Sequence, residues 1–286
     1  MFATETQSHL TTPLVVAAAF LLTASTMFAQ ESPYFVTYDH HAEEPGHIEV
    51  SMAPVVSSPK RGAQSFASTL EIEVGTTAWW TTSLYLDAAA AAETPPLFTG
   101  YRFENRFRLM MEERAVNPVL YLEFADTNGA DRVIKEVVGF DSWRDLAEPL
   151  REGRKERDRE VEAKLILSAD RSGWNLAGNL IAEKNLAGPP WEFGYAIGTS
   201  RPLALAATPA RCWMCRENIT LGVEMYGGLG DQRRFTFAGT SHYIAPALAW
   251  SLPSGMTIRL SPAWGVTGHS NRSILRFAIA YEGRMR

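Results

Sequence analysis

Long runs of residues in which apolar and polar side chains alternate are the feature that most constrains the fold. Three such runs, separated by turn residues, lie between Val161 and Thr199. Each run spans about nine to eleven residues, which exceeds an average soluble strand and suits a tilted strand that crosses a bilayer. The facing sets are Val161, Leu165 and Leu167 against Glu162, Lys164 and Ser168; Trp174, Leu176 and Leu180 against Asn175, Asn179 and Glu183; and Trp191, Phe193, Tyr195 and Ile197 against Glu192, Gly194 and Gly198.

The same alternation recurs from His47 to Tyr281 and predicts about twelve strands, an even number as single-chain bacterial barrels require. If both termini lie on one side of the membrane, every second connection should be short. The second, sixth and tenth connections are indeed tight. These three connections are Gly75–Ala78, Asp170–Gly173 and Leu252–Gly255. The last three expected strands are roughly Tyr243–Leu252, Thr257–Val266 and Ser273–Tyr281.

Two prolines, Pro246 and Pro262, fall in the middle of expected strands. Proline has no backbone N–H to donate, and a closed barrel has no free edge where that loss is harmless. We therefore expect bulges or shortened strands at both positions.

The alternation fits a soluble barrel or sandwich with its apolar face inside, and equally a membrane barrel with its apolar face outside. The long strands and an exported N-terminus favour the membrane barrel. Tryptophans at the ends of apolar faces favour it as well, because they are typical of interfacial girdles: Trp80, Trp174, Trp191, Trp250 and Trp264. We predict an all-β fold, a single antiparallel transmembrane β-barrel over residues 47–286; a soluble exported β-sandwich is the alternative.

The N-terminus predicts export. The apolar stretch Leu14–Leu22 is followed by small residues up to Ala29, which is typical of a signal peptide covering residues 1–29. This stretch is too short to span a bilayer as a helix, and no comparable apolar run follows it. The 27 Lys and Arg against 32 Asp and Glu indicate no general affinity for nucleic acid.

Residues 30–46 are polar, irregular and rich in histidine. His40, His41 and His47 lie beside acidic residues and could bind a soft divalent metal weakly. No fixed ligand spacing supports a site, so we expect an unstructured segment and no metal.

The connection from Asp126 to Glu160 is the longest; its last part, Leu150–Glu160, mixes both signs of charge densely, and helix formers dominate after Asp141. It could form a gate, a partner-binding arm or a contact to lipopolysaccharide at the cell surface. Charge runs are usually solvated, so we expect a solvated loop that is partly helical.

Several strand sequences resemble the meta-pathway phenol-degradation (MetA-like) family of outer-membrane β-barrel transporters. The resemblance covers roughly His47 to Tyr281 and rests on five segments: Gly100–Arg108, Val119–Phe124, Asn179–Lys184, Trp191–Gly198 and Leu221–Gly227. It implies an outer-membrane location and transport of small compounds, aromatic ones among them, and supplies no catalytic residue.

Charged residues on the polar faces are the candidate lumen lining. Charges of both signs inside a narrow barrel should pair across strands. They could simply fill the lumen and hold the barrel shape, or ring a small pore. The candidates are Glu71, Glu73, Arg102, Glu104, Arg106, Arg108, Glu123, Glu162, Lys164, Glu183, Glu192, Glu224, Arg259 and Arg276.

Two short motifs carry other chemistry. His269-Ser270-Asn271 is similar to a motif of barrel-embedded lipid hydrolases but lacks the residue between His and Ser, and neighbours on a strand point to opposite faces. We interpret it as a polar turn. Cys212 and Cys215 form the one C-x-x-C, and in an exported protein a disulfide is expected; a redox-active pair is the alternative.

The sequence thus predicts an outer-membrane barrel that acts as a passive channel for small solutes, with no cofactor, metal or catalytic residue. Outer-membrane lipid and small solutes are the expected partners, and oligomeric state is not indicated. The alternatives are a structural or partner-binding barrel with a blocked lumen, and the soluble sandwich.

Overall fold

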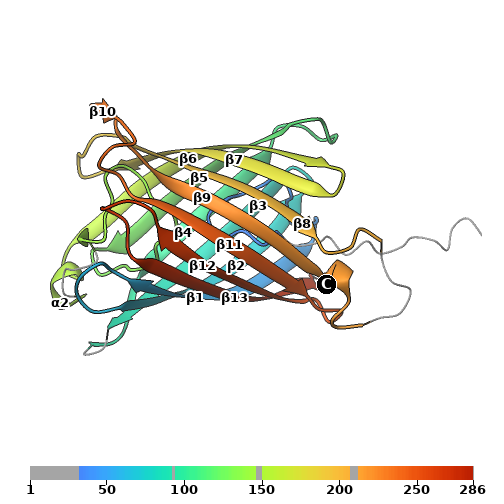
Figure 1. Cartoon of the computed structure of the whole chain (residues 1–286), viewed down its shortest axis with the longest axis horizontal. Helices are drawn as coiled ribbons and strands as arrows, with labels where there is room; N and C mark the ends of the chain where they lie inside the picture. Colours follow the sequence, from blue (N-terminus) through green and yellow to red (C-terminus); the bar gives the residue numbers. More distant parts are fainter. Residues whose placement is uncertain (1–31, 92–93, 146–149, 207–211, 286) are drawn as a thin grey trace, which may run out of the picture. The chain divides into compact units, whose positions relative to one another are not determined.

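A single antiparallel sheet dominates the computed structural model, which describes residues 32–91, 94–145, 150–206 and 212–285. Thirteen strands pair in this sheet (Figure 1). They are β1 His47–Ser58, β2 Ser65–Thr77, β3 Trp80–Ala91, β4 Thr94–Arg108, β5 Asn117–Asn128, β6 Arg157–Arg171, β7 Trp174–Asn185, β8 Glu192–Pro202, β9 Ile219–Asp231, β10 Arg234–Phe235, β11 His242–Ser251, β12 Met256–Gly265 and β13 Ser273–Arg284.

Twelve of these strands close into a barrel, because β13 pairs with β1 over the range from His47 with Arg284 to Ser58 with Ser273. The two-residue strand β10 pairs only with β9 and lies outside the closed cycle. The predicted twelve-stranded antiparallel barrel is confirmed, and a two-layer sandwich is excluded, because a single closed sheet leaves no second layer.

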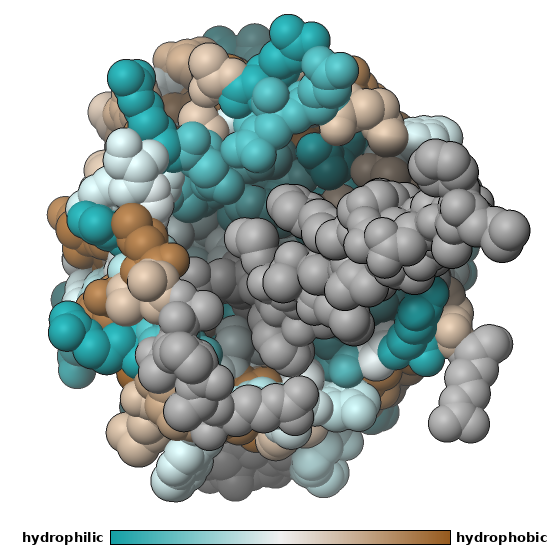
Figure 2. Space-filling view, turned by 90° about the vertical axis from the view of Figure 1, so that its right-hand side faces the viewer, coloured by the Kyte–Doolittle hydropathy of each residue, from teal (hydrophilic) through white to brown (hydrophobic). Residues whose placement is uncertain are grey.

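The apolar face of the strands points outward. On β5, Leu122 is 43% exposed, whereas its neighbours Tyr121 and Glu123 are 0% and 4% exposed. The same contrast recurs around the barrel, where large apolar side chains such as Met52, Leu84, Phe103, Leu165, Leu180, Ile197, Leu221, Ile244 and Ile279 are exposed. Seen from one end, brown and tan hydrophobic residues lie around the outer margin, with teal hydrophilic residues between them (Figure 2).

The tryptophans mark both ends of the barrel wall. Trp80 and Trp174 begin their strands and Trp250 lies one residue before the end of β11, at the end of the barrel where β1 starts. Trp264 and Trp191 lie at the opposite end. Amphipathic rings at both margins of an apolar band are what a lipid bilayer favours.

Pro246 and Pro262 lie in the middle of β11 and β12, and the expected bulges or shortened strands are not found. The register between β11 and β12 is the same on both sides, from Ile244 opposite Trp264 to Leu248 opposite Leu260, and it places the two prolines opposite each other. Pairing is missing only between these flanking pairs. The two positions without a donor therefore share one gap in the ladder, while each proline stays in register with its other neighbouring strand.

Helix is scarce in the described residues. The long connection between β5 and β6 contains α2 Leu150–Gly153, and a 3-10 turn, η2, covers Arg216–Asn218. No helix in the described ranges is long and apolar enough to cross a membrane. The predicted signal peptide, residues 1–29, lies outside the residues that the structure describes.

Substitution of Leu122 by Arg tests the outward face. A charge at the middle of a lipid-facing strand costs about 2–4 kcal/mol in a membrane barrel. We expect Leu122→Arg to lower the free energy of unfolding from lipid vesicles by this amount, measured by urea titration, while the control Leu122→Phe stays near wild type. Equal tolerance of both variants would contradict the outward assignment.

Candidate functional site

The inner face of the barrel collects the charged residues. Eight of the fourteen candidates are buried and six are half-buried. The buried ones are Arg102, Glu104, Glu123, Glu162, Lys164, Glu183, Glu224 and Arg276; the half-buried ones are Glu71, Glu73, Arg106, Arg108, Glu192 and Arg259.

Residues 32–46 occupy one half of the lumen. Three successive backbone N–H groups, those of Phe35, Val36 and Thr37, donate to the carboxylate of Glu224 on β9 at 2.9, 2.9 and 2.7 Å. Further along, Tyr38 exchanges two hydrogen bonds with the side-chain amide of Asn179 on β7, at 2.7 and 2.8 Å. Side chains of the barrel wall therefore hold the main chain of this segment.

This arrangement has a simple physical cause. A buried backbone N–H without a partner costs about as much as a lost hydrogen bond, and residues 32–46 form no helix or strand of their own. The wall supplies the missing acceptors instead, and Val36 is 1% exposed. The expectation of an unstructured segment is therefore wrong, although the segment is irregular.

The connection between β5 and β6 enters the lumen from the other end. Gly139 donates to the carbonyl of Phe193 at 3.0 Å and accepts from Gly230 at 3.2 Å, and Ser241 Oγ donates to the carbonyl of Asp141 at 2.6 Å. Several of its side chains are buried: Ala130, Arg132, Glu136, Val137 and Val138. The expected solvated loop is therefore wrong for residues 130–140.

Small residues on the wall make room for this connection. A Cβ added to Gly194 would lie 2.5 Å from the carbonyl oxygen of Val137, and one added to Gly228 would clash with the carbonyl oxygen of Gly139. The sequence does contain a signal for the burial of this connection. The stretch Val133-Ile-Lys-Glu-Val-Val-Gly-Phe140 is largely apolar, whereas the rest of the connection is rich in charge.

One ion-pair network joins this connection to the wall. Arg102 on β4 lies 2.7 Å from Asp87 and 3.5 Å from Glu123, and Lys135 of the connection pairs with Glu123 and, at 3.4 Å, with Glu162. Burial opposes the charge on Lys135, yet Glu123 and Glu162 outweigh burial and raise its pKa. Lys135 and Asp87 were not among the candidates predicted from the sequence.

Lys164 lies where the two inserted segments approach each other. Its Nζ is 2.9 Å from Glu136 of the connection and 3.0 Å from Glu162 of its own strand. The same ammonium lies 4.5 Å from the ring centroid of Tyr38, in the N-terminal segment, and 4.1 Å from that of Tyr121 on the wall. With its side chain fully buried, Lys164 links both insertions to the wall.

A second network lies nearby on β2, β3 and β4. Arg106 pairs with Glu73 and lies 2.9 Å from Glu104. The hydroxyls of Tyr85 and Tyr38 donate to Glu104 at 2.6 and 3.3 Å. Both partners of Arg106 were candidates from the sequence, whereas the two tyrosines were not.

The remaining candidates have separate surroundings. Arg276 donates to the hydroxyl of Tyr226 at 2.6 Å and to the carbonyl of Ile134 in the connection. Arg259 donates to the carbonyl of Tyr34 at 3.5 Å, and Glu71 accepts from Ser51 at 3.0 Å. Glu192 lies against Gly139, whose φ of 53° suits a residue without Cβ. For Arg108, the described residues show no ion pair.

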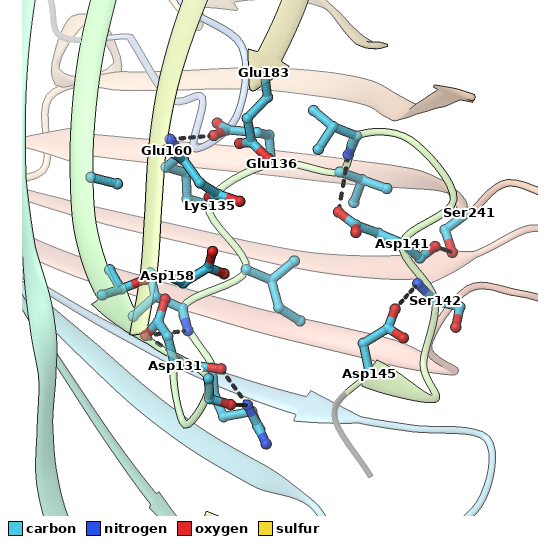
Figure 3. Close-up of a pocket in the computed structure, with 18 of the residues that line it drawn as sticks. Asp131, Lys135, Glu136, Asp141, Ser142, Asp145, Asp158, Glu160, Glu183 and Ser241 are labelled. Atoms are coloured by element: carbon cyan, nitrogen blue, oxygen red, sulfur yellow. Dashed lines mark hydrogen bonds and ion pairs between the residues drawn. The ribbon is translucent and has the colours of Figure 1, made fainter. Parts of the chain in front are cut away.

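A cavity of about 300 Å³ remains between the connection and the wall. Glu136, Glu160 and Glu183 gather near Lys135 on one side of it, and Asp141 and Asp145 lie on the other (Figure 3). Seven of the residues that line it are acidic and three are basic. Burial, and then the charge of Asp87, raise the pKa of Asp131 in this lining to about 6.

The cysteine pair and the His-Ser-Asn motif both lie in connections between strands. Cys212 and Cys215 are joined in a disulfide in the connection between β8 and β9, with Cα atoms 5.5 Å apart. Ser270 lies between β12 and β13, where its hydroxyl accepts from the backbone N–H of His242 at 2.9 Å and donates to its carbonyl at 2.8 Å.

Comparison with known proteins supports the fold. No family model matches the sequence, and no curated protein matches it. Among solved structures, an outer-membrane channel from Pseudomonas putida F1 described as COG4313 aligns with a TM-score of 0.54 at 9% identity, over 86% of this chain and 98% of that chain. At this identity the likeness concerns the fold alone, and the fold is that of an outer-membrane barrel.

Two further structures align at lower scores. The NanC porin aligns with a TM-score of 0.47 at 12% identity, over 83% of this chain and 98% of that chain. OprD of Pseudomonas aeruginosa aligns with a TM-score of 0.38 at 10% identity, over 84% of this chain and 67% of that chain.

Substitution of Arg102 tests whether the buried charges depend on their ion pairs. Removing one partner of a buried ion pair costs about 3–5 kcal/mol, because the other charge stays buried and alone. We expect Arg102→Met, which leaves Asp87 and Glu123 without this partner, to lower the free energy of unfolding by this amount in urea titration. Arg108→Met on the same strand is the matched control and should change little; equal effects would contradict the network.

Proposed function

We propose that this protein is an outer-membrane barrel that acts as a passive channel for small solutes and passes them slowly. The observation that carries the proposal is a closed barrel with an apolar outer face and a charged inner face that retains a cavity of about 300 Å³. A wall of this kind places lipid outside and polar groups inside. Outer-membrane location, removal of residues 1–29 and a lumen-lining role for the fourteen charged residues belong to this proposal.

The two inserted segments set the resistance of the channel. Residues 32–46 and residues 130–140 enter the lumen from opposite ends, so a solute crosses only when both segments move aside. Carboxylates outnumber basic groups around the cavity, and those that are ionised favour cations over anions, as charged rings do in channels. The sequence resemblance to the MetA-like family extends the proposal to small aromatic compounds, and the proposal assigns no catalytic residue.

A second candidate function is a structural or partner-binding barrel with a blocked lumen. The filled lumen favours it, because Val36, Glu136 and Val137 are all less than a tenth exposed. Under this alternative the inserted segments would never leave the lumen, and solute uptake would be absent at any concentration.

Planar-bilayer recording separates the two functions. We expect wild-type protein to show a small, cation-preferring conductance. Glu224→Ala, which removes the acceptor of three backbone N–H groups, should release the N-terminal segment and raise the conductance severalfold. The matched control is Glu71→Ala, which among the described residues loses the hydrogen bond from Ser51 and should leave the conductance unchanged.

Two results would contradict the proposal of a slow channel. A large, stable ohmic conductance of wild-type protein would show that the segments do not restrict the lumen. Absence of conductance in both wild type and Glu224→Ala, together with no uptake of small solutes by proteoliposomes, would favour the blocked barrel.

A further inference from the structure

A cluster of two imidazoles and a carboxylate lies where the N-terminal segment meets the barrel wall. His40 and His41 belong to the segment, and Asp170 lies one residue before the end of β6. His41 Nε2 is 3.1 Å and His40 Nε2 is 4.0 Å from the same oxygen, Oδ2 of Asp170. The three candidate ligand atoms all lie within 4.8 Å of one another.

Each of these groups has a hydrogen-bond partner outside the cluster that orients it. His40 Nδ1 lies 2.6 Å from Ser168 Oγ, and His41 Nδ1 lies 3.1 Å from Asp39 Oδ1. These contacts leave both Nε2 atoms free to face Asp170. An imidazole whose other nitrogen bonds a hydroxyl or a carboxylate is the usual form of a metal ligand.

The third group is oriented in the same way. Asn175 Nδ2 donates to Oδ1 of Asp170 at 2.7 Å and so leaves Oδ2 directed at the two histidines. A tetrahedral ion with ligand bonds near 2.1 Å would hold its ligands roughly 3.4 Å apart, a value between the observed distances. Small side-chain movements would therefore complete the site.

We propose that His40 Nε2, His41 Nε2 and Asp170 Oδ2 bind one divalent transition-metal ion of the zinc class and so fasten the N-terminal segment to β6. Two nitrogen ligands and one oxygen ligand suit such an ion and leave a fourth position for water. The His41 and Asp170 side chains are 53% and 34% exposed, which gives the ion a path to the site, whereas His40 is buried.

A second cluster in the described residues could also hold a metal ion, but its surroundings differ. The carboxylates of Glu136, Glu162 and Glu183 also lie together, but Lys135 and Lys164 already pair with the first two. At the histidine cluster, by contrast, two carboxylates, Asp39 and Asp170, face two imidazoles. An ion bound there replaces the proton that His41 otherwise carries between the two carboxylates, and that proton is released to solvent.

Calorimetric titration of the mature, tag-free barrel in detergent with Zn²⁺ tests the proposal. We expect one equivalent to bind, and both Asp170→Asn and His41→Gln to weaken binding more than ~100-fold, while Asn175→Ala weakens it about 10- to 100-fold, as loss of a supporting hydrogen bond does. The matched control is His47→Gln, because His47 lies 2.5 Å from Glu282 and 3.8 Å from Glu44 outside the cluster. It should bind as wild type does.

A second measurement reports on fastening and does not depend on channel activity. Zn²⁺ should slow hydrogen exchange of the Val36 and Thr37 amides in wild type and not in Asp170→Asn, with heat-modifiable gel migration confirming that each variant is folded. No stoichiometric Zn²⁺ binding by folded wild type would overturn the proposal and leave His41 as a cation between Asp39 and Asp170. Equal binding by Asp170→Asn, or loss of binding in His47→Gln, would overturn it too.

Discussion

The need to pair the charges that a barrel wall turns toward its lumen shapes this molecule. The barrel wall presents its apolar side chains outward, so its charges and its polar side chains must face the lumen. A lumen that protein fills offers little water to solvate them. The structure meets this requirement with cross-strand ion pairs, such as Arg102 with Asp87 and Glu123, and with chain segments folded back into the barrel.

The barrel wall and the two inserted segments depend on each other for hydrogen bonds and ion pairs. Residues 32–46 bring backbone N–H groups that need acceptors, and the wall brings Glu224 and Asn179, whose side chains need donors. The connection between β5 and β6 brings Lys135 to the carboxylates Glu123 and Glu162. A passive channel built in this way opens only as far as these interactions break, which is why we propose slow passage.

The alternation of side chains was enough to predict the number of strands, their direction and their two faces, since a period of two fixes which side each residue takes. It could not predict the insertions, because periodicity describes neighbours along a strand and not segments that return from elsewhere. The dense charges of Leu150–Glu160 suggested a solvated connection, although the valines Val133, Val137 and Val138 did not. The regular strands at Pro246 and Pro262 could not be predicted either, because only the register between β11 and β12 shows that the two prolines face each other.

A spin-label scan along β5 in lipid vesicles tests this account most directly. Labels at Leu120, Leu122 and Phe124 should be accessible to oxygen dissolved in the bilayer, whereas labels at Tyr121, Glu123 and Ala125 should be inaccessible both to oxygen and to a water-soluble nickel chelate. Ready access of the chelate to the second set would show an open, water-filled lumen and contradict the filled barrel described above.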